Sequence, residues 1–419
     1  EVAFKMAECH RKLSQSARAS AAYQNSIRYG NSDSTAHLHL AQMLHAEGKY
    51  GPAIKEYEAY LEIDPENDLA AEGLAGARIA AQKLPSTRYV VKNFKLINSR
   101  RADYAPMFLD KTMQQLYYTT TNEKVTGTGK SQITGMKNGD IWVMKKNEKG
   151  EWTKPEPVEG ELNSEFDEGI VSFTPDGSTM YLTKSKRSPT SNTAVEIYTS
   201  QRSDAKWSAP VKFEITADTI SSYGHPAVSP DGNWLYFTSD MPGGSGGKDI
   251  WRINLKEKGG SLENLGEWIN TPGDEMFPYV RTDSILYFSS NGRSGYGGLD
   301  IYKAELTKSG GWNVTNMGVP VNSSADDFGI TFGDGEFGFF SSNRGDARGY
   351  DHIYSFELPD LKIQISGWVL DKDEEPIPNA VIRIIGNDGS NQKQIAKNDG
   401  SFSFPLNRGV SYAMLAGAK

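Results

Sequence analysis

The segment closest to a catalytic motif is a Gly-x-Ser-x-Gly sequence at Gly243, Ser245 and Gly247. In hydrolases that use this sequence, a sharp turn between a strand and a helix presents the serine beside an oxyanion hole. Here the serine lies in a loop between two expected strands, and the matching loop of the next repeat reads Ser294-Gly295-Tyr296-Gly297-Gly298. This context predicts that Ser245 is not a nucleophile.

Six further side chains fall at related positions, near the start of an expected inner strand in several repeats. Such groups could line the mouth of a central channel and bind a ligand or a peptide terminus. The alternative is that they cap turns and accept hydrogen bonds from backbone amides, and we favour this second interpretation. The six candidates are Asp167, Glu168, Tyr223, His225, Glu275 and Asp327.

The residue pattern gives little support for metal or cofactor chemistry. The single cysteine, Cys9, excludes an internal disulfide framework and a multi-cysteine zinc site. The six histidines are scattered, and His37 and His39 would lie on different faces of a helix. An acidic run at residues 371–375 departs from the spacing of a calcium loop. We therefore expect no metal, no cofactor, no catalytic residues and no enzymatic activity.

The length and charge of the chain limit the kinds of protein to which it can belong. Its 419 residues exceed one ordinary core and predict two or three domains. The formal net charge of −8 argues against a sequence-independent nucleic-acid binder, which needs a basic surface. No apolar run approaches the roughly 20 residues that a membrane-spanning helix requires. The opening Glu1-Val2-Ala3-Phe4 has a helical pattern rather than that of a signal peptide, so we expect a soluble chain without a transmembrane segment.

A short acidic and aromatic phrase returns five times along the chain. The copies are Asp140-Ile141-Trp142, Glu196-Ile197-Tyr198, Asp249-Ile250-Trp251, Asp300-Ile301-Tyr302 and Asp351-His352-Ile353-Tyr354. The last three begin at equal spacing, which indicates one supersecondary unit copied and packed against itself. Each unit holds short strands separated by Gly, Pro, Asn and Asp, which predicts a five-bladed, all-β propeller over residues 86–358. We expect the recurring acid to accept hydrogen bonds from a neighbouring turn.

The two ends of this repeated region are complementary. Residues 89–94 precede the first inner strand, at a place where other units carry their outer strand. The fifth unit stops after Ile353-Tyr354-Ser355-Phe356 without an outer strand of its own. We therefore predict that residues 89–94 complete the fifth blade, so that no long strand edge stays unpaired.

This repeat resembles the TolB-type propeller family, whose units carry a Ser-Pro-Asp-Gly turn and a Gly-Gly-x-Asp-Ile-Tyr strand. The matching segments are Ser229-Pro230-Asp231-Gly232 and Gly297-Gly298-Leu299-Asp300-Ile301-Tyr302. The second unit departs from the pattern, with Glu196 as its acid and no glycine pair before it. The resemblance covers roughly two-thirds of the chain and implies a propeller fold.

Residues 1–85 have helical rather than strand periodicity. Ala19 with Tyr23 and Ala53 with Tyr57 repeat after about 34 residues, a spacing that resembles the tetratricopeptide repeat. The resemblance implies about two repeats and a capping helix, with a concave surface for a peptide or helix. An equally weighted alternative is that so short an array only supports the next domain.

Residues 359–419 alternate like β-strands, in the segments 363–369, 376–382 and 398–404. Their order resembles the carboxypeptidase-regulatory-like β-sandwich, and this resemblance implies an incomplete immunoglobulin-like sandwich that acts as a spacer or adhesion element. The expected fold class is therefore a multidomain chain of α-helical tetratricopeptide repeats, a five-bladed propeller and a truncated β-sandwich.

The three regions in this order resemble the periplasmic OmpA-family proteins of Bacteroidetes. The resemblance implies a non-enzymatic scaffold that links the type IX outer-membrane secretion machinery to the cell wall. Expected partners are proteins of the outer-membrane secretion apparatus, and peptidoglycan only through a C-terminal domain absent from this chain. It further implies that the full-length protein is a periplasmic lipoprotein of the outer membrane. The alternative is a periplasmic peptide- or glycan-binding module that uses the propeller channel.

Overall fold

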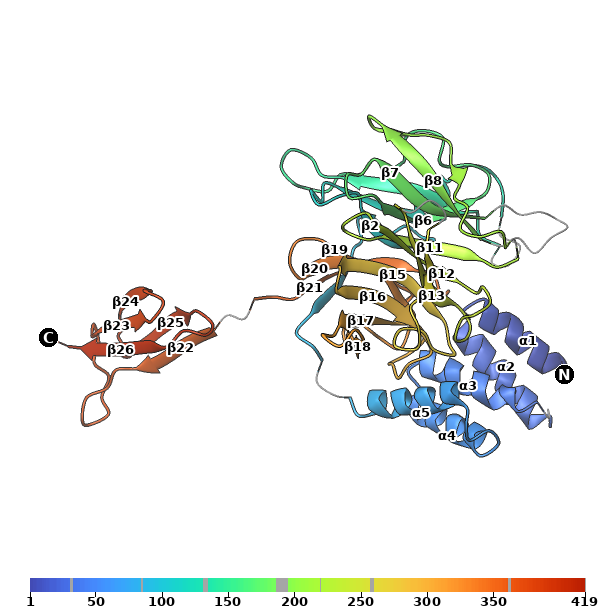
Figure 1. Cartoon of the computed structure of the whole chain (residues 1–419). Coiled ribbons are helices and arrows are strands. Elements are labelled where there is room, and N and C mark those ends of the chain that lie inside the picture. The colour runs from blue at the N-terminus through green and yellow to red at the C-terminus, as the bar shows by residue number, and fades with distance from the viewer. Residues whose placement is uncertain are drawn as a thin grey trace. The chain divides into compact units, whose positions relative to one another are not determined.

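The computed structural model describes residues 1–30, 33–83, 86–130, 135–185, 195–218, 220–256, 260–360 and 363–418. The chain forms two compact units, Glu1–Leu358 and Pro359–Lys419. The first unit begins with an N-terminal helical region, which we call the helical front, and continues with a set of antiparallel sheets. Figure 1 colours these parts from the N-terminus to the C-terminus. The predicted domain boundary between residues 85 and 86 adjoins positions 84–85, which lie outside the described residues.

Five antiparallel sheets of four main strands follow one another along the first unit. The first sheet contains β2 (Asp103–Phe108), β3 (Gln115–Thr120), β4 (Asp140–Lys145) and β5 (Glu156–Pro157). The second contains β6 (Asp167–Phe173), β7 (Thr179–Ser185), β8 (Glu196–Ser203) and β10 (Val211–Lys212), and β9 (Lys206–Trp207) also pairs with β8. The third contains β11 (Tyr223–Val228), β12 (Trp234–Ser239), β13 (Asp249–Asn254) and β14 (Leu262–Asn264). The fourth contains β15 (Glu275–Thr282), β16 (Ile285–Ser290), β17 (Asp300–Leu306) and β18 (Trp312–Asn316). The fifth contains β19 (Asp327–Phe332), β20 (Phe337–Ser342), β21 (His352–Glu357) and β1 (Val90–Asn93).

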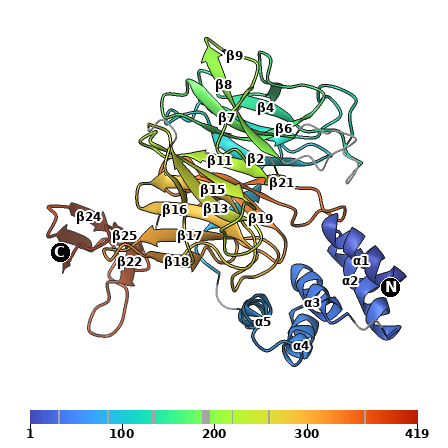
Figure 2. The same ribbon diagram turned by 45° about the vertical axis from the view of Figure 1, so that its right-hand side comes forward.

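The innermost strands contact one another in a closed ring, which makes the five sheets the blades of a propeller. Strand β2 contacts β6, β6 contacts β11, β11 contacts β15, β15 contacts β19, and β19 returns to β2. Between neighbouring blades lie the aromatic side chains of the second strands, among them Phe237, Phe288 and Phe340, all fully buried. Both faces of these strands are covered, so their residues form near-continuous apolar runs. Figure 2 shows the same blades from a second direction.

The predicted closure of the propeller is confirmed. Strand β1 pairs antiparallel with β21, with Val90 opposite Glu357 and Asn93 opposite Tyr354. Tyr89 and Val91 pack against the buried cluster of the fifth blade that contains Phe356. The first strand of the propeller thus covers the edge that the last blade would otherwise expose.

This closure predicts a large difference between two shortened chains that both lack the helices. A chain that begins at residue 86 keeps β1, whereas a chain that begins at residue 95 loses it and exposes the edge of β21. We expect the shorter chain to be less stable by about 3 kcal/mol or more, because Tyr89 and Val91 leave the core. Urea unfolding and size-exclusion chromatography measure the difference, and equal stability and equal solubility of the two chains would contradict it.

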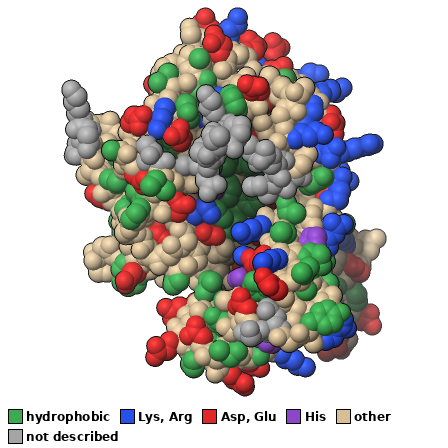
Figure 3. Space-filling view, turned by 90° about the vertical axis from the view of Figure 1, so that its right-hand side faces the viewer, with side chains coloured by type: hydrophobic (Ala, Val, Ile, Leu, Met, Phe, Trp, Pro, Cys, Tyr) green, Lys and Arg blue, Asp and Glu red, His purple; other side chains and the backbone are tan. Residues whose placement is uncertain are grey.

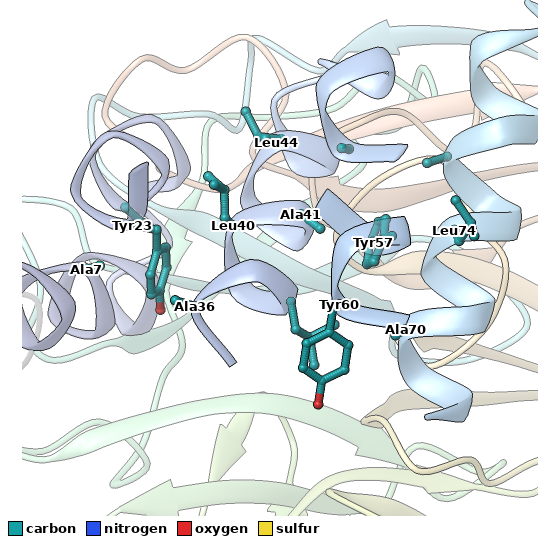
Figure 4. Close-up of a cluster of buried hydrophobic side chains, with 14 of the residues drawn as sticks. Ala7, Tyr23, Ala36, Leu40, Ala41, Leu44, Tyr57, Tyr60, Ala70 and Leu74 are labelled. Atoms are coloured by element: carbon teal, nitrogen blue, oxygen red, sulfur yellow. The ribbon is translucent and has the colours of Figure 1, made fainter. Parts of the chain in front are cut away.

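The helical front consists of α1 (Val2–Lys12), α2 (Ser16–Arg28), α3 (Thr35–Ala46), α4 (Tyr50–Leu61) and α5 (Asp68–Ala81). Consecutive helices pack against each other, and their shared core is built from small alanines and a few large side chains. Figure 4 shows Tyr23, Leu40 and Tyr57 pointing between the helices, beside Ala7 and Ala41. Within the described ranges, no helix combines the length and the apolar character needed to cross a membrane.

The expected fold class, which began with a tetratricopeptide repeat domain, is wrong. Five short helices join the propeller in one compact unit, so the chain is mainly β-sheet and propeller-like. The residues behind the expectation are indeed packed, since Ala19, Tyr23, Ala53 and Tyr57 are all buried. Small residues beside tyrosines allow any two antiparallel helices to approach closely, so this spacing arises without an array of repeats.

The second unit is described by itself. Strand β22 (Ile363–Trp368) pairs with β25 (Ser401–Leu406), and β23 (Val381–Gly386) lies between β24 (Asn391–Ile395) and β26 (Tyr412–Gly417). Ile382, Ile384 and Phe404 are buried in a core that draws on both sheets. Alternating residues of β23 are therefore buried and exposed, as expected for a sheet with one covered face.

Candidate functional site

The centre of the propeller is lined by one unusual residue from each inner strand. Each inner strand has an irregular register, and within it one residue takes a positive φ. These residues are Ala105, Ile170, His225, Phe277 and Gly329, with φ between 47° and 62°. Only glycine adopts this conformation without strain, and for a β-branched residue such as isoleucine it is a clear outlier. The sequence carries no sign of this feature except at Gly329.

Hydroxyl groups of the preceding blade hold these strained residues in place. The backbone N–H of Ala105 donates to Ser341 Oγ at 2.8 Å, and that of His225 donates to Thr183 Oγ1 at 3.0 Å. The N–H of Ile170 donates to a threonine hydroxyl of β3 in the same way. At these three positions a hydroxyl residue of a second strand therefore ties one blade to the next.

We predict that Thr183→Val weakens the propeller by about 1–3 kcal/mol, because it leaves the buried N–H of His225 without an acceptor. Thr179→Val is the matched control, since Thr179 lies on the same strand and its hydroxyl bonds only to Gln201 near the surface. We expect the control to change stability by less than about 0.5 kcal/mol. Chemical denaturation of both variants measures the difference, and equal effects would show that the hydroxyl bond is not what holds the blade.

His225, the predicted channel histidine, is built into the ring as a neutral side chain. Its Nδ1 accepts the backbone N–H of Phe277 at 3.2 Å, so its proton lies on Nε2. Its ring stacks on that of Phe277 with centroids 3.9 Å apart. Burial lowers the pKa of His225 to about 3. This histidine is therefore uncharged at neutral pH and serves as a hydrogen-bonding part of the core.

The cavity at this position is too small for an organic ligand. It has a volume of about 20 Å³ and is lined mainly by Pro106, Ile170, Phe277, Pro278 and Ile330 beside His225. A space of this size holds a single water molecule. The apolar side chains of the five inner strands thus fill the centre of the propeller.

The predicted acids Glu168, Glu275 and Asp327 are buried. Their carboxylates are hydrogen-bonded to nearby turns. Each carboxylate accepts the backbone N–H of the residue four positions earlier, at 3.0, 2.7 and 2.6 Å respectively. Glu168 also pairs with Lys184 at 2.7 Å, and Asp327 pairs with Arg344. The structure therefore places these groups at three separate blade junctions and does not bring them to one site.

Glu275 differs from the other two acids in its surroundings. Its carboxylate accepts hydrogen bonds from the hydroxyls of Thr271 at 2.7 Å and Ser290 at 2.5 Å. Burial outweighs these bonds and raises the pKa of Glu275 to about 7. Burial also raises the pKa of Asp327, against the effect of Arg344.

The remaining two candidates also have structural partners. Asp167 Oδ1 accepts the backbone N–H of Gly139 at 2.7 Å, which links the first blade to the second. The hydroxyl of Tyr223 lies 2.8 Å from that of Thr216. Tyr223 stands where the four other junctions have an acid, namely Asp103, Glu168, Glu275 and Asp327. It lies at the same junction where Glu196 replaces the recurring aspartate.

The prediction that the recurring aspartates accept hydrogen bonds from a neighbouring turn is confirmed at three positions. Asp140, Asp249 and Asp300 accept backbone N–H groups of Thr126, Ser245 and Tyr296, at 2.6, 2.6 and 2.5 Å. Ser245 is thus part of a turn between β12 and β13, and no helix begins there. Among the residues that the structure describes, no group of three histidine, cysteine or acidic side chains is arranged to hold a metal ion.

A second repeated feature, a pair of hydrogen bonds from an asparagine side chain to the backbone of an isoleucine, was not predicted from the sequence. Asn322 accepts the N–H of Ile301 at 2.8 Å through Oδ1 and donates to its carbonyl at 2.8 Å through Nδ2. Asn98, Asn163 and Asn270 do the same to Ile353, Ile141 and Ile250. The signal was available, because each of these asparagines precedes a serine or threonine and stands five positions before an acid.

The helical front is fixed to the fourth blade by a close contact. Glu72 on α5 accepts the backbone N–H of Ser294 at 2.8 Å and also bonds to its hydroxyl. Gly76, one turn later, lies so near Gly295 that a Cβ atom there would be 2.6 Å from its backbone N and O atoms. His45 is buried at the same place, and burial lowers its pKa to about 4. Helices and propeller are therefore in direct contact here, and we call this contact the joint.

Comparisons with known proteins add the following. No protein-family model matches the chain, and no curated protein matches it. Among solved structures, the chain is similar to TolB from Acinetobacter baumannii, with 17% identity, a TM-score of 0.35 and 69% of each chain covered. It is also similar to alpha-L-arabinofuranosidase from Lactobacillus brevis, with 12% identity, a TM-score of 0.36 and coverage of 68% of this chain and 95% of that one. A prolyl endopeptidase structure matches with 11% identity and a TM-score of 0.30, over 79% of this chain and 43% of its own length. The propeller fold itself follows from the strand pairing and the ring of inner strands described above.

Proposed function

We propose that this chain is part of a non-enzymatic periplasmic scaffold, a PorE-like component that links type IX secretion machinery to the cell wall through protein–protein contacts. In this proposal the full-length protein is an outer-membrane lipoprotein. Peptidoglycan is bound by a further domain that is absent from this chain. The repeated propeller units, with the turn at Ser229-Pro230-Asp231-Gly232, motivate the proposal.

The observation that carries the proposal is the joint between α5 and the fourth blade. The bonds from Ser294 to Glu72 and the approach of Gly76 to Gly295 join the helices to the propeller within one compact unit. A scaffold that binds several partners needs more than one surface on the same unit. The filled centre of the propeller agrees with binding at outer surfaces.

The alternative of a peptide- or glycan-binding channel receives no support from the geometry. The cavity at His225 has about 20 Å³, which is far below the several hundred Å³ of ordinary ligand sites. We also propose that the chain is not an enzyme. The backbone N–H of Ser245 donates to Asp249 within a turn. The Nδ1 of His225 already accepts the backbone N–H of Phe277 and is not free to act as a base.

The test is recovery of partners from cross-linked cell envelopes with the full-length protein as bait. We expect secretion-apparatus proteins in the eluate, and a reduced yield from Gly76→Ala, because this change disturbs the joint. Gly51→Ala is the matched control, since Gly51 lies on α4 with open space around it. Recovery of cell-wall material alone, without any secretion protein, would overturn the scaffold role.

A further inference from the structure

A group of cations gathers on the loops of the first and fifth blades. We call it the cationic loop patch and define it as Arg101, Lys124, Lys130, Lys137 and Arg348. The residues come from the segment before β2, the loop between β3 and β4, and the loop between β20 and β21. Strand closure brings these distant segments together, because β1 pairs with β21 in the fifth sheet and leads directly into β2.

Tyr350 joins the two arginines of the patch. Arg101 Nη1 donates to the hydroxyl of Tyr350 at 3.3 Å, and the guanidinium of Arg348 lies 4.5 Å from the centre of its ring. The two positive charges are near enough to act on each other. An arginine held on an aromatic ring is pre-organised, so it loses little freedom when it binds an anion.

The neighbouring acids balance only part of this charge. Glu123 pairs with Arg101 at 2.6 Å, and its backbone oxygen accepts from Lys137 Nζ at 2.8 Å. Asp346 pairs with Arg348 at 2.8 Å, but only 9% of its side chain is exposed. Five cations therefore lie beside three acids on this surface, Glu123, Glu165 and Asp346, although the whole chain has a net charge of −8.

We infer that the cationic loop patch binds an acidic segment of a protein partner, with Arg101 and Arg348 as its main contacts. Two planar guanidinium groups on either side of a tyrosine can each form paired hydrogen bonds with a carboxylate. The ion pair of Arg348 with Asp346 already shows this geometry, with one donor to each carboxylate oxygen. Arg101 directs two donors to a single oxygen of Glu123. An incoming glutamate or aspartate replaces or joins these internal partners. Figure 3 shows lysine and arginine side chains gathered on one side of the face that carries the propeller loops and the helices.

A protein segment fits this surface better than a nucleic acid or a membrane. A long polyanion touches a wide area, and most of this chain is acidic and repels it. The same repulsion acts against the wide anionic surface of a membrane. A short acidic segment needs only the local excess of positive charge.

The inference rests on the proposed role as a protein-binding scaffold, and a direct binding experiment tests it. The probe is a short fluorescent peptide of alternating glutamate and serine, titrated with the purified chain and followed by anisotropy. The test variant combines Arg101→Gln, Lys124→Gln, Lys130→Gln and Arg348→Gln. The matched control combines Lys149→Gln, Lys154→Gln, Lys206→Gln and Lys308→Gln, four exposed lysines that change the net charge equally.

We expect the native chain to bind the peptide in a salt-dependent manner, and the test variant to bind about tenfold more weakly. The control variant should stay within about twofold of the native chain, because a non-specific charge effect would weaken both variants alike. A matching peptide with glutamine in place of glutamate should not bind. Equal binding by the test variant overturns the inference. Tighter binding to duplex DNA or to phosphatidylglycerol vesicles, lost in the test variant, also overturns it and assigns the patch to a different anion.

The envelope experiment separates this inference from the proposed function. Recovery of secretion proteins by the test variant, at the level of the native bait, shows that the scaffold role holds and the patch is not its contact. Binding of the acidic peptide without any secretion partner shows the reverse, an anion-binding patch on a protein with another role.

Discussion

Replacing Gly76 by alanine is expected to destabilise the first unit, although alanine is the better helix former. In an exposed helix the change stabilises by about 1 kcal/mol. At Gly76, however, the added Cβ would lie 2.6 Å from the backbone N and O atoms of Gly295, and backbone cannot rotate away as a side chain can. We expect a net loss of about 2 kcal/mol, a typical cost of overpacking. Thermal unfolding followed by circular dichroism measures it, together with hydrogen exchange of α5 and of residues 292–298.

Gly51→Ala separates the two effects, because Gly51 also lies inside a helix but has no atom within 4 Å of the place that an added Cβ would occupy. We expect this control to stabilise α4 by up to about 1 kcal/mol. Hydrogen exchange should become faster in α5 and in the loop of Ser294 only in the Gly76 variant. If the Gly76 variant is as stable as the Gly51 variant, the contact between α5 and the fourth blade tolerates the added methyl group without loss of stability, and the prediction is wrong.

The second large effect concerns pH and the buried Glu275. Its pKa rises from the ordinary 4.5 to about 7 in the folded chain, mainly through burial. Between these values the folded state holds a proton that the unfolded state has released. The free energy of unfolding therefore falls as the pH rises through this window, by about 3 kcal/mol in total, since each pKa unit is worth about 1.4 kcal/mol. Asp140 and Asp351, with pKa values raised to about 6 and about 7, add to the same trend.

Glu275→Gln should flatten this trend, because glutamine does not titrate. The slope of stability against pH is the readout rather than the stability at one pH, since glutamine also alters the bonds to Thr271 and Ser290. Glu267→Gln, which removes an exposed carboxylate near the same blade, is the control and should leave the slope as it is. Urea unfolding from pH 4 to pH 8 gives both slopes, and an unchanged slope in the Glu275 variant would contradict the prediction.

The joint and the cationic loop patch lie on different parts of the first unit. The helices are fixed to the fourth blade through Glu72 and Gly76, whereas the patch lies on the first and fifth blades. Two surfaces of different chemistry, one helical and one cationic, thus belong to one compact unit. The proposed scaffold role would use them to bind two partners.

The sequence by itself determined the repeated architecture. Each blade is a run of neighbouring strands joined by short turns, so the Asp-Ile-Tyr phrase and the Ser-Pro-Asp-Gly turn report contacts between residues near in the chain. The closing strand at residues 89–94 was also predictable, because one unit lacked an outer strand and another had one to spare. The recurring aspartates bond to turns a few residues away, for example Asp249 to Ser245, and local bonds leave a local pattern.

Only the tertiary structure decided the features that join distant residues. The positive φ of Ile170 and His225 depends on hydroxyls of another blade, so no local propensity announces it. The helical front was misassigned for the same reason, since alanine and tyrosine spacing describes helix pairs but not what the helices are attached to. The contact of Gly76 with Gly295 and the approach of Arg101 to Arg348 each join residues more than two hundred positions apart. Closure of the ring brings Arg101 near Arg348, and packing of the helices against the fourth blade brings Gly76 near Gly295. Neither contact produces a periodic pattern in the sequence.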